Sequence, residues 1–422
     1  MLKLIPKDPP PGPSQRDFWY SPLRGPWLTS FLGSLLLVAL TIIAATGFLS
    51  HLAYAPDIGQ NALIPRSGSF DWLFVDWPTG FPWLYAVTQG LHVTIGFATV
   101  PLLLAKLWSV IPRLFEWPPV RGPVHALERL TLLMLVGGGI FQFATGIANV
   151  QLYYPFHFSF LVAHYYGAWI FLSALVLHVG VKLPTIRRAY RERGVLKPLI
   201  DDLTRDRDNM EPDAGNYLVA PVPEHTTITR RGLLGVVGAS SAALLVTTGG
   251  QSVGGPFRRL AVLAPRGGDI NFPVNKTASA AGVTRKLVGS HWRLALKGAK
   301  PVELSREQLL AMPQATYALP IACVEGWSST QRWTGVRLRD LAAAAGADED
   351  MIAQVGSLQP RGVLRRATLT PGQVGDERSL LALKVNGRDL PLDHGYPARI
   401  IVPGLPGVHN TKWVAAITFQ RA

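Results

Sequence analysis

Residues 130–181 read LTLLMLVGGGIFQFATGIANVQLYYPFHFSFLVAHYYGAWIFLSALVLHVGV, which is 52 residues without Asp, Glu, Lys or Arg. A helix crosses the hydrocarbon core of a bilayer with about 20 apolar residues, so this run is too long for one span. The turn-like sequence QLYYP at 151–155 divides it into two predicted membrane helices, at 127–150 and 160–183. The stretch therefore predicts an all-α membrane region.

Three further uncharged runs predict three more spans. They lie near 27–49, within 78–105 and within 232–257. Only 16% of the 422 residues are charged, against about 25% in soluble proteins. This composition excludes a disordered chain and a simple soluble enzyme, and it favours a membrane protein with a soluble part.

Basic residues alternate between the loops. The arm before the first span and the loops at 106–129 and 182–231 are rich in Lys and Arg, whereas the loop at 151–159 has none. Because Lys and Arg collect on the cytoplasmic side, the N-terminus is expected inside and the chain beyond residue 250 outside. The predicted organisation is a cytoplasmic arm (1–26), a four-helix transmembrane domain (27–190), a cytoplasmic linker (191–228), a fifth transmembrane helix (229–250) and an exported domain (251–422).

The fifth span opens with Thr229-Arg230-Arg231-Gly232-Leu233-Leu234. Twin arginines before a weakly apolar helix rich in Gly and Ala look like a twin-arginine export signal, here internal. An ordinary basic flank on the cytoplasmic side explains the same pair, so both interpretations stay open.

Beyond residue 250, short strand-like segments replace the helical runs. The pattern predicts strands at 292–296, 316–323, 380–385 and 399–402, a short helix at 340–345 and an Asn-Gly hairpin at 385–388. We expect a mixed α+β domain. Of the net charge of +14, this domain holds +10, from 22 basic and 12 acidic residues. The charge therefore belongs to the exported domain and is no argument for nucleic-acid binding.

Histidines in the membrane half are candidate haem ligands, because ionisable side chains inside spans are costly. His164 and His178 are 14 residues apart on one predicted helix, so they share a face about 21 Å apart along the axis. Two haems stacked across a bilayer need this arrangement. By depth, His92 pairs with His164 at an outer iron, and His125 pairs with His178 at an inner one. Helix capping and interhelical hydrogen bonds are the alternative.

This half resembles the four-helix b-type cytochrome subunits of formate dehydrogenases and hydrogenases. The resemblance rests on His92 and on the stretch 158–184, with HYYGAW at 164–169 and Leu177-His178. It implies haem b and electron exchange with quinone. In such subunits the inner haem usually takes a ligand from the first helix, which has no His at its cytoplasmic end here. One haem and two haems both remain open.

The chain has a single cysteine, Cys323, in LPIACVEGW at 319–327. One thiol excludes an intramolecular disulfide, a four-cysteine iron–sulfur site and a CxxCH haem attachment. By residue type alone, a lone cysteine is ordinarily a small buried hydrophobe.

Three ordered segments resemble the molybdenum-binding domain of the sulfite oxidase family. They are the Cys323 segment continuing to WTGVRLRDL (333–341), LPLDHGYPAR (390–399), and VPG (402–404) followed by NTKW (410–413). The bacterial branch with the periplasmic methionine sulfoxide reductases, which work with a haem-bearing membrane partner, is closest in texture. A molybdenum–pterin centre takes two thiolates from the pterin, so one protein thiolate is sufficient.

The resemblance also implies roles for individual residues. Cys323 would bind molybdenum, His394 and Arg399 would hold the pterin, and Lys412 with Thr411 would reach its phosphate. Asn275 lies where the family often begins its cofactor contacts. Glu325 and Arg332, with Trp327, flank Cys323 and would line the catalytic pocket.

We therefore predict a multi-domain membrane-bound molybdenum oxidoreductase of the bacterial inner membrane, multi-pass, with its catalytic domain on the outer side. The expected cofactors are Mo-molybdopterin and one or two haems b, and the expected partners are the lipid bilayer, quinone and a small-molecule substrate. Oxygen-atom transfer on a small S- or N-oxide is the preferred reaction. The alternatives are a sulfite-type dehydrogenase, electron supply by a cytoplasmic flavoprotein, and a non-catalytic haem electron carrier with a ligand-binding outer domain.

Overall fold

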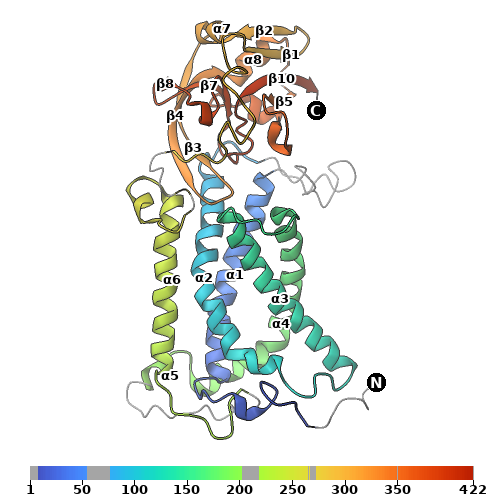
Figure 1. Cartoon of the computed structure of the whole chain (residues 1–422), viewed down its shortest axis with the longest axis vertical. Coiled ribbons are helices and arrows are strands. Elements are labelled where there is room, and N and C mark those ends of the chain that lie inside the picture. The colour runs from blue at the N-terminus through green and yellow to red at the C-terminus, as the bar shows by residue number, and fades with distance from the viewer. Residues whose placement is uncertain are drawn as a thin grey trace. The chain divides into compact units, whose positions relative to one another are not determined.

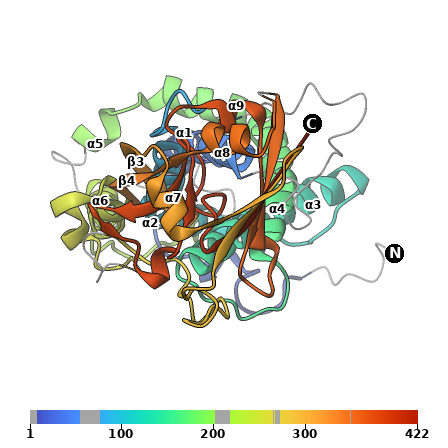
Figure 2. The ribbon, with the colours of Figure 1, turned by 90° about the horizontal axis from the view of Figure 1, so that it is seen from above.

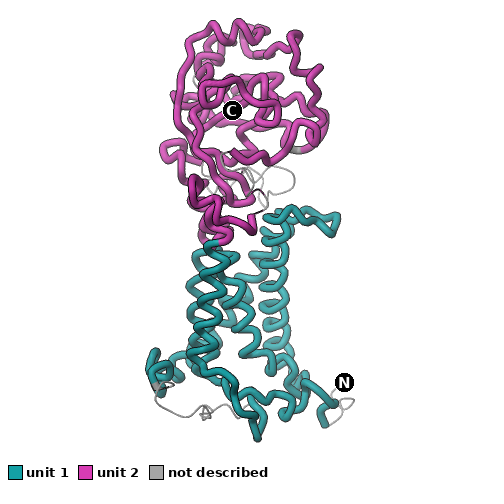
Figure 3. Tube along the Cα trace, turned by 60° about the vertical axis from the view of Figure 1, so that its left-hand side comes forward, with its two compact units in different colours: residues 1–44, 95–246 teal, residues 45–94, 247–422 magenta. Residues whose placement is uncertain are grey.

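The structure is a computed structural model that describes residues 8–54, 77–201, 218–264, 266, 272–348 and 350–421. The chain divides into two compact units, coloured separately in Figure 3. Unit 1 comprises residues 1–44 and 95–246, and unit 2 comprises residues 45–94 and 247–422. The division falls inside three long helices, so one end of each of them belongs to unit 2.

Among the residues that the structure describes, five helices are long and apolar enough to cross a membrane (Figure 1). They are α1 (Pro26–Ala53), α2 (Leu84–Leu114), α3 (Pro123–Val150), α4 (Phe160–Arg193) and α6 (Arg230–Val253). The five predicted spans are thus confirmed as helices. Helix α2 begins later than the uncharged run suggested, and α4 continues about ten residues beyond the predicted end. Its extension is rich in arginine, a good helix former that is also well solvated. The short helix α5 (Lys197–Asp201) follows.

Helices α3 and α4 of unit 1 pack through small residues. A Cβ added at Gly138 would lie 3.4 Å from the Cβ of Phe171, and one at Gly167 would collide with the side-chain amide of Gln142. Glycines let two helix backbones approach closely, which is the usual means of helix association in membranes.

The two arginines at the start of α6 differ in their burial. Arg230 is buried, and its guanidinium donates hydrogen bonds to the carbonyl oxygens of Leu23 (3.3 Å) and Pro22 (3.2 Å). Arg231 is exposed. Arg230 therefore ties the start of α6 to the N-terminal arm, and a role of the pair in export stays a prediction.

The described part of unit 2 contains two five-stranded sheets. The first has the order β2-β1-β10-β5-β6, in which β1 and β10 are parallel and the other neighbours are antiparallel. The second has the order β3-β4-β7-β8, with β9 also paired to β7. The strands are β1 (Arg293–Lys297), β2 (Val302–Ser305), β3 (Ala315–Ala322), β4 (Ser328–Arg337), β5 (Met351–Ser357), β6 (Arg366–Leu369), β7 (Leu380–Val385), β8 (Arg388–Asp389), β9 (Arg399–Ile401) and β10 (Val414–Arg421).

Short helices complete this unit: α7 (Arg306–Ala311), α8 (Leu338–Ala344) and α9 (Pro371–Gly375), which can be followed in Figure 2. The four predicted strands correspond to β1, β3, β7 and β9, and the predicted helix to α8. The Asn-Gly hairpin joins β7 to β8, with positive φ at Asn386 (52°) and Gly387 (78°). Positive φ at both central residues is the conformation that this hairpin turn requires.

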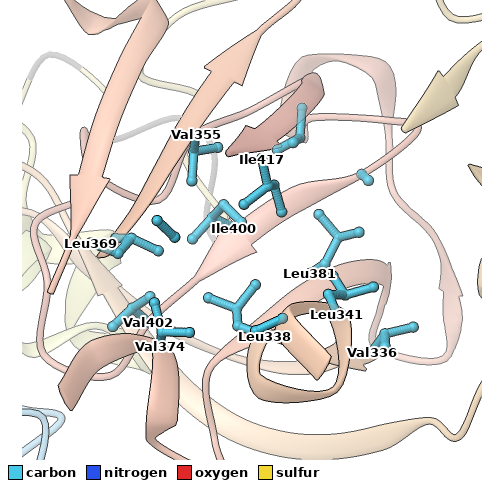
Figure 4. Close-up of a cluster of buried hydrophobic side chains, with 14 of the residues drawn as sticks. Val336, Leu338, Leu341, Val355, Leu369, Val374, Leu381, Ile400, Val402 and Ile417 are labelled. Carbon is cyan, nitrogen blue, oxygen red and sulfur yellow. The ribbon is translucent and has the colours of Figure 1, made fainter. Parts of the chain in front are cut away.

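The main core of unit 2 joins both sheets to the short helices. Figure 4 shows part of it, including Val336, Leu341 and Ile400. Ala53, Trp77 and Tyr85 belong to the same buried cluster. The compact unit thus includes the ends of α1 and α2 as well as the chain after residue 250, because their apolar side chains complete its core.

Candidate molybdenum–pterin site

Cys323 is the first residue after β3, in the tight connection to β4. The N–H of Cys323 donates to the carbonyl of Trp327 (3.0 Å), and the N–H of Gly326 donates back to the carbonyl of Cys323 (2.9 Å). Gly326 has φ of +89°, a conformation that favours glycine. The thiol is 3% exposed, and burial, with the nearby Glu325 carboxylate second, raises the pKa of Cys323 to about 12. A bound metal cation would deprotonate such a thiol outright.

Three predicted pterin residues lie together at β9 of the second sheet and in the segments before and after it. Arg399 of β9 donates through Nη1 to the carbonyl of His394 (3.0 Å) and through Nη2 to that of Asn410 (3.1 Å). Lys412 Nζ donates to the carbonyls of Lys276 (2.7 Å) and Asp393 (2.8 Å). We call Arg399, Lys412 and His394 the basic cluster; all three side chains are buried.

Gly395 makes the close approach of two of these residues possible. Its φ is +110°, and a Cβ there would lie 3.0 Å from the Cβ of Arg399 and 3.2 Å from that of Lys412. The glycine in the LPLDHGYPAR segment therefore has a packing reason as well as a conformational one.

Burial disfavours the protonated forms of the three side chains in the basic cluster and so lowers their pKa values. Burial lowers the pKa of Arg399 to about 9. Burial, with the Arg399 charge second, lowers the pKa of Lys412 to about 7 and that of His394 to about 4. A concentration of buried cationic groups is unfavourable unless an anion accompanies it.

Two buried polar atoms at this place have no hydrogen-bond partner among the described residues, Arg399 Nε and Thr411 Oγ1. Unpaired buried polar atoms are costly, and an anion with several acceptor oxygens would pair with both. The residues present therefore fit the anionic pterin cofactor, which Arg399, Lys412, His394 and Thr411 would hold.

The segment 272–276 borders the basic cluster. The Phe272 ring stacks on the His394 ring, with centroids 3.7 Å apart and an angle of 8° between the planes. Asn275 is half-buried, and its side-chain oxygen accepts the N–H of Lys276 (2.9 Å). Asn275 is therefore next in the chain to Lys276, whose carbonyl accepts a hydrogen bond from Lys412, and its contact with the cofactor stays a prediction.

The two predicted pocket residues differ. Glu325 is buried, and its carboxylate accepts two hydrogen bonds from Arg266 (2.6 and 3.1 Å) and one from Trp327 Nε1 (3.1 Å). Arg332 is exposed on β4, whereas its neighbour Trp333 is fully buried under Arg399. Since side chains alternate along a strand, Arg332 faces away from the basic cluster. The structure does not bring it to the site.

Some residues of the site had no signal in the sequence motifs. Arg266, which neutralises Glu325, lies outside every matching segment. His409 Nε2 lies 2.9 Å from the carbonyl oxygen of Tyr54, and Trp77 Nε1 donates to the carbonyl of Gly404 (2.8 Å). Their partners are hundreds of positions away, so local patterns do not reveal these contacts.

The candidate haem ligands are divided between the units. His164 belongs to unit 1, where its Nδ1 lies 3.0 Å from Thr145 Oγ1. His92 belongs to unit 2, where its ring packs against Gly47 of α1. His125 Nδ1 accepts the N–H of Arg121 (3.1 Å), and His178 is half-buried on α4. Both histidine pairs stay predictions. Among the described residues, no group of three or more His, Cys, Asp or Glu forms a metal site.

Comparisons with known proteins concern the C-terminal part. A family model described as "Oxidoreductase molybdopterin binding domain" matches residues 281–422. The chain is 31% identical to a nitrate reductase [NADH] of Volvox carteri over 169 residues, 32% of this chain and 20% of the relative. It is 34% identical to the mitochondrial sulfite oxidase of Homo sapiens over 102 residues, 22% and 19% of the two chains.

An uncharacterized oxidoreductase of Bacillus subtilis, YuiH, is 32% identical over 133 residues, 31% of this chain and 66% of the relative. The crystal structure of the sulfane dehydrogenase SoxCD from Paracoccus pantotrophus matches at 26% identity over 32% of this chain and 39% of that one, with a TM-score of 0.30. The chain spans 20% and 19% of the nitrate reductase and the human sulfite oxidase. Residues 281–422, which contain Cys323 and the basic cluster, form a molybdopterin-binding oxidoreductase domain of the sulfite oxidase family.

Proposed function

We propose that the protein is a membrane-bound molybdenum oxidoreductase whose outward-facing Mo–pterin centre exchanges electrons with the quinone pool through haem b. One observation carries the proposal. Arg399 and Lys412, with their charges buried and a guanidinium nitrogen left unpaired, lie in the same compact unit as the only cysteine. An anionic cofactor that needs one protein thiolate accounts for both features.

Each residue of the site would make a different contact with this cofactor. Cys323 supplies the thiolate. Arg399 and Lys412 neutralise anionic oxygens, and Thr411 adds a hydroxyl donor. The Phe272 ring covers His394 and limits access of water to it. When bound, a Mo–pterin centre supplies two-electron oxygen-atom transfer.

The membrane part of the proposal rests on the five apolar helices and on the distribution of basic residues. We propose a multi-pass protein of the bacterial inner membrane, with the N-terminus in the cytoplasm and unit 2 carrying the catalytic domain outside.

For haem, the contact between Thr145 and His164 is the supporting geometry. A hydrogen-bonding partner at one ring nitrogen fixes the imidazole, as partners of metal-bound histidines do. We propose His92 and His164 at an outer haem, and His178 with His125 at an inner one. Quinone, reached from the haem, is the proposed electron partner.

The preferred substrate is a small S- or N-oxide that is reduced. A second candidate is oxidation of sulfite or a similar small anion. The identity over 102 residues to a protein named sulfite oxidase favours this second reaction, as does the basic cluster, whose Lys412 interacts electrostatically with Cys323. The two reactions run in opposite electron directions.

The decisive experiment is metal and haem analysis of the purified full-length protein, followed by mixing with substrate. About one molybdenum per chain is expected. After reduction by quinol, an S-oxide should reoxidise the haem; sulfite should instead reduce oxidised haem if the second candidate holds. If protein produced with a full supply of cofactors contained no molybdenum, the proposed molybdenum oxidoreductase would be excluded.

Cys323→Ser gives the matching variant. It should keep the pterin, which other residues hold, and lose turnover by more than about 100-fold, above the range for residues around a metal site. Full turnover in this variant would remove Cys323 from the metal. The exposed Thr330→Ser variant on β4 serves as the control, with unchanged turnover.

A further inference from the structure

We infer that the ends of the membrane helices α2 and α6 position the Cys323 turn, through Gln89, Gln251 and Ser252. The turn comprises residues 323–327, between β3 and β4. Its three consecutive carbonyl groups after the cysteine each accept a hydrogen bond from one of these side chains. The inference rests on the proposed function in that Cys323 is taken as the metal ligand.

The contacts are specific. Gln89 Nε2 donates to the carbonyl of Val324 (2.6 Å), Gln251 Nε2 to that of Glu325 (3.2 Å), and Ser252 Oγ to that of Gly326 (2.6 Å). All six residues belong to unit 2. Gln89 comes from α2 and the other two donors from the last turn of α6. We call these three side chains the clamp.

Further contacts close the clamp from the other direction. Ser328 Oγ donates to the carbonyl of Ser252 (2.6 Å), and Arg258 Nη2 donates to the carbonyls of Ser328 and Gln251. A Cβ at Gly326 would lie 2.8 Å from the Cβ of Val93 on α2. At Gly326 the turn therefore packs closely against the Val93 side chain of α2, and it is hydrogen-bonded to side chains of both helices.

Small residues let the two helix ends meet at this point. A Cβ at Gly90 would lie 3.0 Å from the Cβ of Ser252, and one at Gly249 would lie 3.0 Å from Thr94 Cγ2. Close approach through small residues is a stable form of helix packing. The three clamp donors thus come from two helix ends that pack directly against each other.

The consequence for the site is geometric. Cys323 is held within the turn by its own two backbone hydrogen bonds, so fixing the next three carbonyls also fixes where its Sγ lies. Partners that orient metal ligands commonly affect metal affinity or activity by about 10–100-fold. Gln89 also lies one helical turn before His92 on α2. The metal-bearing turn and a candidate haem ligand therefore share one helix segment.

The test uses the full-length protein in detergent, prepared with and without cofactor. The variant is Gln89→Leu combined with Ser252→Ala. Its matched control is Thr88→Val combined with Ser240→Ala: Thr88 is adjacent on α2 and bonds Ser50, and Ser240 is exposed on α6. Amide hydrogen exchange of a peptide covering 319–330 is measured first, since it needs no activity.

The clamp predicts about tenfold or faster exchange of this peptide in the variant, in both preparations, and no change in the control. In cofactor-loaded protein, molybdenum content should persist because the basic cluster is intact. The Mo(V) electron paramagnetic resonance signal should shift or broaden, and turnover with a soluble dye donor should fall about tenfold.

Equal exchange in variant and control would overturn the inference. So would faster exchange with an unchanged Mo(V) signal, because the turn would then be held without positioning the metal. If the wild-type protein contains no molybdenum, the proposed function fails, and the metal-positioning role fails with it; the exchange result then reports only on the turn. If the double variant does not accumulate, Ser252→Ala alone, which removes one hydroxyl, carries the same comparison.

Discussion

Helices α3 and α4 meet through glycines, whereas the loops around β9 close over buried cations. The helix pair has Gly138 and Gly167 at its contacts, a polar link from Thr145 to His164, and an ion pair from Lys182 to Glu128 toward the basic end of α4. The β9 loops bury Arg399 and Lys412 and leave polar atoms unpaired. In a bilayer, charge is excluded and close packing stabilises the fold. In unit 2, burying these cationic side chains costs stability, and the proposed anion would offset that cost.

The largest effect is expected when a buried cation near β9 is removed. Arg399→Met should leave the sheets intact and lower the affinity for the molybdenum cofactor by about 10–100-fold, because an anion loses its guanidinium partner. Molybdenum content of the purified protein measures this. Arg388→Met, an exposed change on β8, is the control and should retain the metal. Full metal content in Arg399→Met would show that the buried guanidinium has a purely structural role.

On the helical side, His164→Ala tests whether the polar link at α3–α4 serves a haem. It should remove one haem spectral component, and His92→Ala should remove the same component. The reduced-minus-oxidised haem spectrum is the measurement. His291→Ala, at an exposed position of unit 2, is the control. Unchanged haem content in both variants would separate the helix packing from cofactor binding.

Packing itself is tested at two glycines of the same helix. Gly167→Val should destabilise the α3–α4 contact by roughly 1–3 kcal/mol, as overpacked sites do. Gly180→Val should cost less, since nothing lies within 4 Å of a Cβ added there. The thermal unfolding midpoints of the two variants in one detergent give the comparison. Equal midpoints would mean that the glycine contact contributes little.

The smallest effect concerns pH and the cofactor-free protein. Burial lowers the pKa of Lys412 from 10.5 to about 7 in the folded chain. Between pH 7 and pH 9 the unfolded chain then binds more protons than the folded one, so stability rises with pH. The thermal unfolding midpoint of the protein should therefore rise by several degrees between pH 7 and pH 9. In the Lys412→Met variant this rise should be smaller. The exposed Lys297→Met variant should keep it; a flat wild-type profile would contradict the buried charge.

The sequence predicted much of the local structure for physical reasons that operate locally. Uncharged runs specify helices because each helix satisfies its own backbone hydrogen bonds. The Asn-Gly pair specifies the β7–β8 turn because both residues tolerate positive φ. Three of the residues named from family motifs, Arg399, Lys412 and His394, do lie together in the folded chain.

Contacts between residues far apart in the chain could not be predicted from local sequence patterns. Arg332 was named for its closeness to Cys323 in the chain, but strand alternation directs it away from the basic cluster. Glu325 looked like a pocket acid, yet Arg266, 59 positions away, binds its carboxylate. Proximity along the chain does not determine side-chain direction once a strand begins.

The sequence alone determined the five apolar helices, the mixed α+β domain and the single possible thiolate ligand, because these follow from residue type and spacing. The tertiary structure decided which atoms surround that thiol. It placed Gln89 and Ser252 on the Cys323 turn and completed the core of unit 2 with Ala53, Trp77 and Tyr85. Such contacts depend on the packing of segments distant in the chain, where burial and hydrogen-bond pairing of the whole unit determine the arrangement.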